Sequence, residues 1–335
     1  MCHTLSMARP DTTPESSIPE QTAGLSGNDP GHPGSPDPDS AAESTHGPLF
    51  PPAVLAACPL PERGVVLAGT PLGNIWDASP RLAAALARAD VIAAEDTRRT
   101  RQLAERLHVE ITARVVSHFE HNETSRAEEL VEQAAHSLVL VVTDAGMPVV
   151  ADPGFPIVKL AHSVGVPVTV IPGPSAATTA LAACGIAAGA FTFAGFAPRK
   201  SGQRKTWLKN LDSDTAVTVL FDSPHRIGQT LADAAEVFGA DRQAAVAREM
   251  TKIHEEIIRG SLGELADICA DGLRGEITLV IAPGQAAEPD PGELIGEVRQ
   301  LVAAGMKLKA ACGQVAAMTG VKKNRLYAAV IEANN

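Results

Sequence analysis

The chain has 335 residues, of which 45% are hydrophobic, 20% are charged and only 3% are aromatic. This length exceeds that of a usual single domain, and the composition supplies enough apolar residues for aliphatic, alanine-rich cores. The formal net charge of −11 argues against binding of nucleic acid through bulk positive charge, although it leaves room for a local basic surface.

The N-terminal tail, taken as residues 1–62, is rich in Pro, Ser, Gly, Asp and Thr, and no apolar period appears through residue 52, so we expect disorder. Residues 1–63 hold eight acids and two bases, which is more than half of the net charge. We expect no signal peptide, because no charged segment precedes an unbroken apolar stretch. The segment "VLAAC" (54–58) resembles a lipoprotein cleavage box, but prolines precede it, and we interpret it as a linker into the first strand.

From residue 64, short apolar runs alternate with helical patterns. The first five runs, which we predict to be strands, are "GVVLAG" (64–69), "DVIAAE" (90–95), "ARVVSH" (113–118), "LVLVVT" (138–143) and "VPVTVI" (166–171). Helices are predicted to open at Ser79, to cover 124–136 and to end at Gly165. Strands that are apolar throughout and alternate with helices indicate a parallel sheet covered on both faces.

A second block repeats this alternation. Its predicted strands are "FTFAGF" (191–196), "TAVTVLFD" (215–222), "QAAVARE" (243–249) and "EITLVIA" (276–282), and its helices lie near 203–211, 226–238 and 263–270. Short helical patterns with a turn at Gly320 fill 293–333. Prolines and glycines interrupt the apolar segment 166–198, so no membrane-spanning helix fits there.

These patterns predict an α/β fold of two domains. The first, residues 63–186, would hold a largely parallel sheet and the second, residues 187–287, a mixed sheet. Residues 288–335 would form a small helical appendage that resembles a helix-turn-helix module, although a mere packing appendage is an equal interpretation.

Nearly every unusual polar, Gly or Pro residue of the first half follows one of the five strands. These exits are "GTPLGN" (69–74), "AAEDTRRT" (93–100), "SHFEHNE" (117–123), "TDAGMPVVADPG" (143–154) and "PGPSA" (172–176). Parallel strands bring their carboxyl ends to one edge of the sheet, so the clustering predicts a ligand site there. The loops lack glycine-rich phosphate motifs and carry acids and prolines, which favours a ligand without phosphates, such as the sulfonium S-adenosylmethionine.

Together with "FAGFAPRK", "FDSPHRI" and "AREMTKIHEE", these motifs resemble the bacterial 16S rRNA (cytidine-2′-O)-methyltransferases of the tetrapyrrole-methylase superfamily. The resemblance runs from about residue 64 to 331 with the motifs in the same order. It implies a class III methyltransferase that methylates the ribose 2′-oxygen of cytidine 1402 in the 16S rRNA of the 30S subunit. It also implies S-adenosylmethionine as cofactor, held between two α/β domains, and a homodimer without a membrane segment.

Cysteine usage points to the same compartment as the resemblance, which implies a cytoplasmic protein. The five cysteines are odd in number and form no C-x-x-C pair, which argues against a disulfide framework or a structural zinc site and favours a reducing cytosol.

The resemblance implies that the loop after the fourth strand wraps the methionine and ribose of the cofactor. The residues it assigns to cofactor binding are Pro71, Asp144, Ala145, Gly146, Met147, Ser175, Ala176, Met250 and Thr278. Gly146 would allow a close backbone approach, and Ser175 would also cap the next helix. Thr70, Pro71 and Leu72 would form the floor beneath the acceptor.

Methyl transfer to a ribose hydroxyl needs alignment of the acceptor and benefits from a nearby base. The candidate catalytic residues stand at the second and third exits and are Glu95, Asp96, His118 and Glu120, with His121 beside them. Asp96 can instead pair with Arg98 or cap a helix, and His118 can be a satisfied residue at a strand end. The two histidines form a weak metal pattern, and the reaction needs none, so we expect no metal.

The segment "PRKSGQRKTWLKN" (198–210) contains five bases and no acid, so we expect it to hold rRNA phosphates. The residues predicted to bind RNA are Arg98, Arg199, Lys200, Arg204, Lys205 and Arg226. Trp207 is expected to anchor a core rather than to stack on a base. "RRTR" (98–101) and "KKNR" (322–325) are secondary basic patches.

Two other functional classes stay open at this point. A small-molecule methylase of the tetrapyrrole type explains the strand exits but leaves the basic segment without a role. A non-catalytic RNA-binding protein explains the basic segment but not the five decorated exits.

Overall fold

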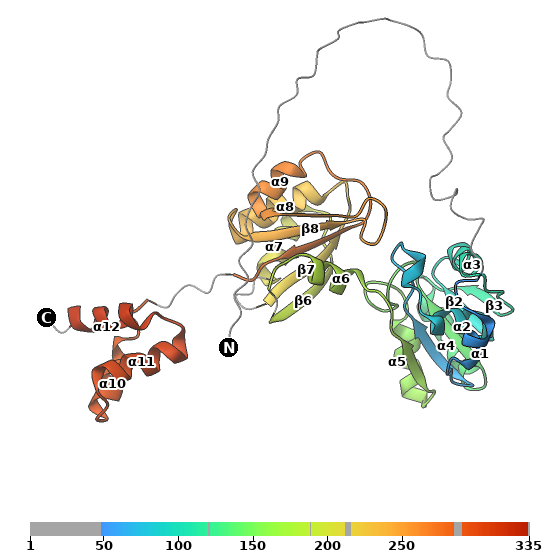
Figure 1. The fold of residues 1–335 in the computed structure, drawn as a ribbon, viewed down its shortest axis with the longest axis horizontal. Helices are drawn as coiled ribbons and strands as arrows, with labels where there is room; N and C mark the ends of the chain where they lie inside the picture. Colours follow the sequence, from blue (N-terminus) through green and yellow to red (C-terminus); the bar gives the residue numbers. More distant parts are fainter. Residues whose placement is uncertain (1–47, 120, 188, 212–215, 285–289, 334–335) are drawn as a thin grey trace, which may run out of the picture. The chain divides into compact units, whose positions relative to one another are not determined.

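The computed structural model describes residues 48–335 except 120, 188, 212–215, 285–289 and 334–335 (Figure 1). The predicted disorder of residues 1–47 lies outside the described residues. The prediction that the tail extends to residue 62 is wrong for its last part, where Pro52–Ala57 form helix α1. Leu49, Phe50, Leu55 and Leu60 pack against the first core, and this apolar burial orders the segment despite its prolines.

The first sheet contains five strands in the order β3-β2-β4-β1-β5, and every pairing is parallel, as predicted. The strands are β1 (Gly64–Ala68), β2 (Val91–Ala94), β3 (Arg114–Ser117), β4 (Leu138–Val142) and β5 (Val168–Ile171). β1, β2 and β4 are buried at every position, because helices cover both faces of the sheet. All five carboxyl ends therefore lie at one edge.

Alternate side chains of these strands enter two different cores. Val66, Ile92 and Leu140 pack with α2, whereas Val65 and Val139 pack with α4 and α5 on the other face. The helices of this part are α2 (Pro80–Arg88), α3 (Thr97–Arg106), α4 (Glu123–Ala134) and α5 (Phe155–Val164), with a 3-10 turn η2 (Ile75–Asp77).

Two predicted helix ends follow from local chemistry. The Leu82 N–H donates to Ser79 Oγ at 3.1 Å, so Ser79 caps α2 as expected. Gly165 has a φ of 74° and ends α5 in the left-handed conformation that favours glycine.

The second sheet is mixed and has the order β6-β7-β10-β8-β9. Its strands are β6 (Ala190–Phe196), β7 (Ala216–Asp222), β8 (Gln243–Arg248), β9 (Glu256–Ser261) and β10 (Ile277–Ile281). β6 pairs with β7 in parallel, and the remaining pairings are antiparallel. Sequence patterns missed β9, because this edge strand is only half-buried and carries few apolar residues.

Helices also cover both faces of the second sheet. α7 (Ser201–Leu211), α8 (Ile227–Phe238) and α9 (Leu262–Ile268) pack on one face, where Leu208, Leu231 and Leu265 share a core. α6 (Ala176–Ala183) directly follows β5 of the first sheet, yet its Ala177 and Ala180 pack against the opposite face of the second sheet. α6 thus links the two halves, and the predicted domain boundary at residue 186 stays a prediction.

The last three helices form a core of their own. They are α10 (Ile295–Ala303), α11 (Leu308–Thr319) and α12 (Lys323–Glu332), and Val298, Val315 and Leu326 pack together between them. Gly320, with a φ of 79°, ends α11 at the predicted turn. No helix among the described residues has the length and apolar character needed to cross a membrane.

Candidate active site

The loops that follow β1 and β4 are joined by a short antiparallel bridge between Thr70 and Gly146. The Thr70 N–H donates to the Gly146 carbonyl at 2.9 Å, and the Gly146 N–H donates back at 3.1 Å. The Thr70 hydroxyl also donates to the Thr143 carbonyl at 3.2 Å. Gly146 has a φ of 91°, which favours glycine, so this residue allows the loop to turn back and form the bridge.

The loops after β1 and β5 approach one another more closely than side chains would permit. A Cβ atom placed on Gly69 would lie 2.7 Å from the Gly173 Cα and 2.7 Å from the Met147 Sδ. These glycines are therefore needed for backbone contact. Three of the five strand exits are thereby held in one compact group.

A cavity of about 570 Å³ opens at these exits and is also lined by residues of the second sheet. Its volume is in the range of small-molecule sites. Eight of the nine residues predicted to bind the cofactor line it, and Pro71 does not, whereas its neighbour Leu72 does. The common location supports a shared ligand for these eight residues, and their individual roles stay a prediction.

Two details of the cofactor predictions need correction or refinement. Ser175 occupies the N-cap position of α6, but its side chain makes no capping hydrogen bond, so it stays available to the cavity. Met250 follows β8 between Glu249 and Thr251, whose φ angles of 49° and 67° are unusual for non-glycine residues. The Asn74 N–H donates to the Thr251 Oγ1 at 3.2 Å and so connects the β1 exit with this turn.

Carboxylates dominate the charge of the cavity wall. Glu95 accepts a hydrogen bond from the Asp144 N–H at 3.1 Å, and Asp144 accepts one from the Asp96 N–H at 3.1 Å. Asp144 also pairs with Arg99 at 3.1 Å. Burial raises the pKa of both Glu95 and Asp144, because it disfavours their charged forms.

Asp152, like Asp222 and Glu276, is an acid in this wall that the sequence predictions did not select. Burial, with a further contribution from the charges of Glu95 and Asp144, raises the pKa of Asp152 to about 7. The sequence signal that could have identified Asp152 is its position in "TDAGMPVVADPG". There, two prolines and a second aspartate make the segment after the strand longer than a plain turn.

The four candidate catalytic residues lie in different environments. Glu95 lines the cavity, whereas Asp96 does not. The Asp96 Oδ1 caps α3 by accepting a hydrogen bond from the Arg98 N–H at 2.8 Å, and the Asp96 Oδ2 pairs with the Arg98 side chain at 3.3 Å. The hydrogen bond from the Arg98 side chain lowers the pKa of Asp96. These contacts fit the structural interpretation of Asp96 and argue against it as a base. Glu120 lies outside the described residues.

His118 is also absent from the cavity wall. Its side chain is buried with 1% exposure, burial lowers its pKa, and neither ring nitrogen has a partner among the described residues. Within the described part of the chain, this argues against the expectation of a satisfied strand-end histidine. His121 is exposed and makes an edge-to-face contact with Phe119. Among the described residues, no group of three metal-ligating side chains occurs.

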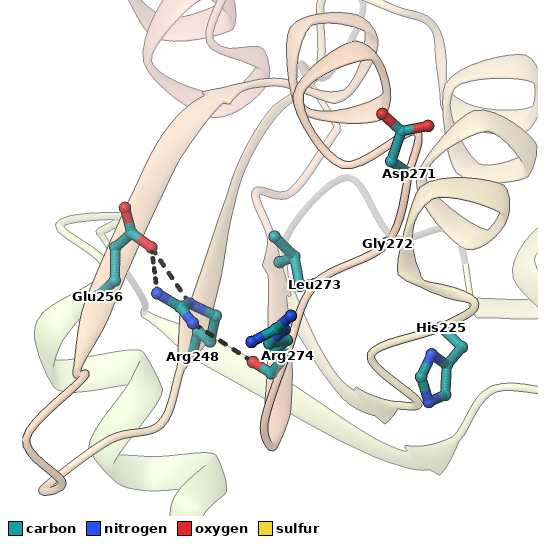
Figure 2. Close-up of a pocket in the computed structure, with 7 residues that line it drawn as sticks. All are labelled: His225, Arg248, Glu256, Asp271, Gly272, Leu273 and Arg274. Carbon is teal, nitrogen blue, oxygen red and sulfur yellow. Dashed lines mark hydrogen bonds and ion pairs between the residues drawn. The ribbon is translucent and has the colours of Figure 1, made fainter. Parts of the chain in front are cut away.

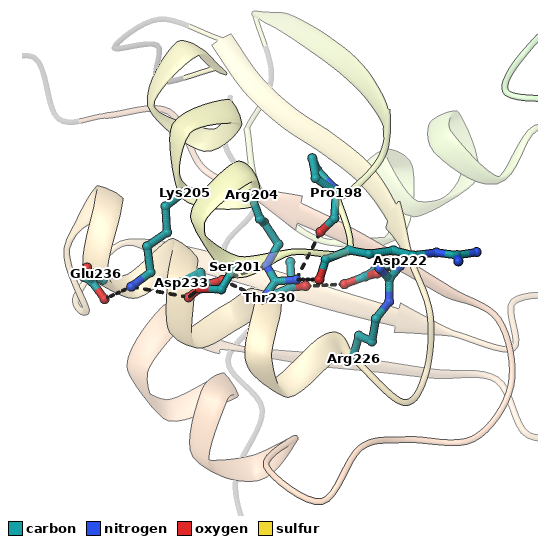
Figure 3. A network of polar contacts seen from close by, with 10 residues as sticks. Pro198, Ser201, Arg204, Lys205, Asp222, Arg226, Thr230, Asp233 and Glu236 are labelled. Atoms are coloured by element: carbon teal, nitrogen blue, oxygen red, sulfur yellow. Dashed lines mark hydrogen bonds and ion pairs between the residues drawn. The ribbon is translucent and has the colours of Figure 1, made fainter.

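The prediction that Arg204 binds RNA is wrong. Arg204 is 1% exposed, and its Nη2 pairs with Asp233 of α8 at 2.6 Å, while its Nη1 donates to the Pro198 carbonyl at 3.1 Å (Figure 3). The residue lies on the inner face of α7, where a free cation would be costly, and Asp233 neutralises it. Lys205 lies beside Arg204 and pairs with Glu236 and Asp233, so its ammonium group is less available to RNA phosphates than predicted.

Other predicted RNA-binding residues stay accessible. Arg199 and Arg226 line the cavity, and Lys200 and Arg98 are exposed. Arg226 pairs through Nη2 with the buried Asp222 at 2.6 Å, whereas its Nη1 has no partner among the described residues. Trp207 packs against the core beneath α7, in agreement with its structural interpretation.

A second hollow, of about 460 Å³, lies at the second sheet and contains none of the predicted site residues (Figure 2). Arg248 is held there by Glu256 at 2.9 Å and donates to the Arg274 carbonyl at 3.5 Å. This internal pairing gives no indication of a ligand, and we assign no site to it.

The chain is similar to known methylases. Residues 64–266 match the model of the tetrapyrrole (corrin/porphyrin) methylases, and residues 288–334 match that of the RsmI C-terminal HTH domain. Ribosomal RNA small subunit methyltransferase I of Mycobacterium tuberculosis (strain ATCC 25618 / H37Rv) is 50% identical over 270 residues, which cover 80% of this chain and 94% of that protein. The protein of the same name from Mesorhizobium japonicum is 39% identical and covers 81% of this chain and 92% of its own length. The one from Escherichia coli O157:H7 is 37% identical and covers 78% of this chain and 93% of its own length.

A solved structure shares the fold. A conserved hypothetical protein from Aeropyrum pernix K1 aligns with a TM-score of 0.51 and 19% identity over 81% of this chain and 96% of that one.

Replacement of Arg204 by methionine should reduce stability, because it leaves the buried Asp233 with only the Ser201 hydroxyl at 2.9 Å and Lys205 at 3.7 Å as partners. We expect the free energy of unfolding to fall by about 3–5 kcal/mol, measured by urea denaturation. Lys200→Met, on the exposed side of the same segment, should change it by less than about 0.5 kcal/mol. A stable Arg204→Met protein with weakened RNA binding would restore the original prediction.

Proposed function

The chain belongs to the ribosomal RNA small subunit methyltransferase I family and is an S-adenosylmethionine-dependent methyltransferase; from this premise we propose that its acceptor is the 2′-oxygen of cytidine 1402 in the 16S rRNA of the 30S subunit. The observation that carries the proposal is the acid-rich cavity with Arg199 and Arg226 in its wall. Carboxylates suit a cationic methyl donor, and arginines suit the phosphates of an RNA acceptor.

The residues of the cavity fit the cofactor. Five carboxylates line it against three arginines, and the wall includes apolar surface from Met147, Phe196 and Met250. We propose that the Asp144–Met147 loop holds the methionine end and that Met250 and Thr278 contact the adenine. When bound, the cofactor supplies an electrophilic methyl carbon on a sulfonium, whose sulfur leaves as a neutral thioether.

The chain itself then has to orient the acceptor and keep water away. Leu72, beside the Thr70–Gly146 bridge, provides a rigid apolar surface beneath the acceptor. Arg226, whose Nη1 is buried without a partner among the described residues, is suited to a phosphate oxygen next to the target nucleotide. A phosphate oxygen at this position would satisfy the N–H group, which otherwise stays without a hydrogen-bond partner among the described residues.

The proposal is tested by methylation of 30S subunits that lack the modification. We expect transfer of a labelled methyl group from S-adenosylmethionine to a single site, which mass spectrometry of nuclease fragments should place on the ribose of cytidine 1402. A porphyrinogen, offered under the same conditions, should accept none. Methylation of a base, of another nucleotide or of the porphyrinogen would reject the proposed acceptor.

Removal of the accessible cations should weaken RNA binding. For the double variant Arg199→Gln/Lys200→Gln we expect a higher KM for 30S subunits. The slope of log binding constant against log salt concentration should become shallower by about 0.7–0.9 for each phosphate that the protein no longer neutralises. Lys159→Gln on α5 removes one exposed charge as a control and should leave both quantities unchanged. An unaltered salt dependence in the double variant would place the RNA elsewhere.

We further propose that the protein is a cytoplasmic homodimer, in keeping with its ribosomal acceptor and the family resemblance. The unpaired edge of the second sheet supports self-association, because β6 exposes 45% of Phe191 there. Light scattering should give twice the chain mass, and Phe191→Glu should shift it toward one chain. Met318→Glu, which alters another exposed apolar residue, on α11, should stay dimeric. A wild-type protein with the mass of one chain would refute the dimer.

A further inference from the structure

Five carboxylates line the cavity, and four of them already have partners. Glu95 and Asp144 accept backbone hydrogen bonds, and Asp144 also pairs with Arg99. The other two pairs are Asp222 with Arg226 at 2.6 Å and Glu276 with Lys252 at 3.1 Å. Asp152 is the fifth, and it makes no hydrogen bond or ion pair with the described residues. It is therefore the carboxylate in the wall that is free to accept a proton from a ligand.

The backbone around Asp152 is strained and held in place. Val149 and Ala151 have φ angles of 74° and 67°, a region that costs non-glycine residues about 1–3 kcal/mol each. The Val149 N–H donates to the Pro153 carbonyl at 3.2 Å, and the Gly154 N–H donates to a Glu123 carboxylate of α4 at 2.8 Å. These hydrogen bonds hold the strained loop in place, and with it the position of Asp152 in the cavity wall.

The charges that face Asp152 come from two neighbouring strand exits. Glu95 follows β2 and Asp144 follows β4, and both raise the energy of a charged Asp152, while Arg99 of α3 offsets Asp144. With a pKa of about 7, Asp152 is divided between its two protonation states at neutral pH. A general base works best when its pKa lies near the working pH.

We propose that Asp152 is the general base of the methyl transfer, an inference that rests on the proposed function. The acceptor hydroxyl gives its proton to an Asp152 carboxylate oxygen while its own oxygen forms a bond to the methyl carbon and the carbon–sulfur bond breaks. The products are a methyl ether, a neutral thioether and a carboxylic acid, so the charges of sulfonium and carboxylate cancel. Asp152 then returns its proton to solvent.

The first test compares Asp152→Asn with wild type in single-turnover methylation of 30S subunits. The variant should be slower by roughly 100- to 10,000-fold, because it cannot accept the proton. At S-adenosylmethionine concentrations far below saturation, where the rate reports the free enzyme, the wild-type rate should rise with pH with a midpoint near 7, since the protonated acid is inactive as a base. Asp152→Asn should lose this dependence. A variant within about threefold of wild type would overturn the inference.

Binding supplies a readout that does not depend on turnover. A cationic donor beside Asp152 should displace its proton, so calorimetry of S-adenosylmethionine binding at pH 7, in buffers of different ionisation enthalpy, should detect release of about half a proton from wild type. Asp152→Asn should release markedly less. Equal release from both proteins would show that Asp152 does not face the donor, and would overturn the inference.

Two controls separate the base from a structural role. Asp152→Asn should bind S-adenosylhomocysteine, which lacks the sulfonium charge, within about threefold of wild type, and such binding would show that the cavity is intact. If the Asn variant does not bind this ligand, Asp152→Glu takes its place in the test and should keep the pH dependence at a lower rate.

Glu95→Gln keeps an acceptor for the Asp144 N–H but removes a negative charge near Asp152, so this variant should move the midpoint of the pH profile to lower pH. A Glu95→Gln profile with an unmoved midpoint would contradict the assignment.

The two proposals fail in different ways. If wild type does not methylate the ribose of cytidine 1402, the proposed acceptor is wrong, whatever Asp152 does. If wild type methylates it and Asp152→Asn does so equally well, only the inference about Asp152 is wrong.

Discussion

Glu95, Asp144 and Asp152 reach one cavity from two adjacent strand exits, and their mutual repulsion in a partly buried wall is the constraint on which the site depends. Arg99 and two backbone N–H groups stabilise the first two carboxylates. Nothing comparable among the described residues stabilises Asp152, so it holds a proton unusually well. A bound cation would relieve the repulsion, which couples binding of the methyl donor to formation of the charged carboxylate.

This arrangement needs a backbone that does not relax away from the repulsion. The Thr70–Gly146 bridge and the contact of Gly69 with Gly173 tie three strand exits together. Residues with positive φ lie on both sides of the cavity, at Val149 and Ala151 in the first half and at Glu249 and Thr251 in the second. Strain of this kind persists where surrounding contacts hold it, and here it brings Asp152 and Met250 to the cavity wall.

Positive charge is divided between two tasks in this acidic chain. On the inner side of α7, Arg204 neutralises Asp233 and contributes to packing. Outside this packing, Arg199 before α7 and Arg226 before α8 line the cavity, and Lys200 next to Arg199 is exposed. Only the second group can respond to RNA phosphates, so the basic segment is a smaller electrostatic surface than its sequence suggests.

The amino-acid sequence by itself determined the features that depend on near neighbours in the chain. The apolar runs of β1, β2 and β4, the cap at Ser79 and the turns at Gly165 and Gly320 arise from local periodicity and backbone preference. The sequence also predicted that the loops after the first five strands lie together, because a parallel sheet places the carboxyl ends of all its strands at one edge.

Tertiary structure alone decided how the charged residues are used. Arg204 and Lys200 belong to the same basic run, yet one is buried against Asp233 and the other is exposed, because the pairing depends on which face of α7 meets α8. Asp96 and Asp152 are both aspartates at strand exits, yet Asp96 caps a helix, whereas Asp152 lines the cavity without a partner in the described part of the chain. Burial and the position of distant charges set these differences, and neither quantity is contained in the spacing of residues along the chain.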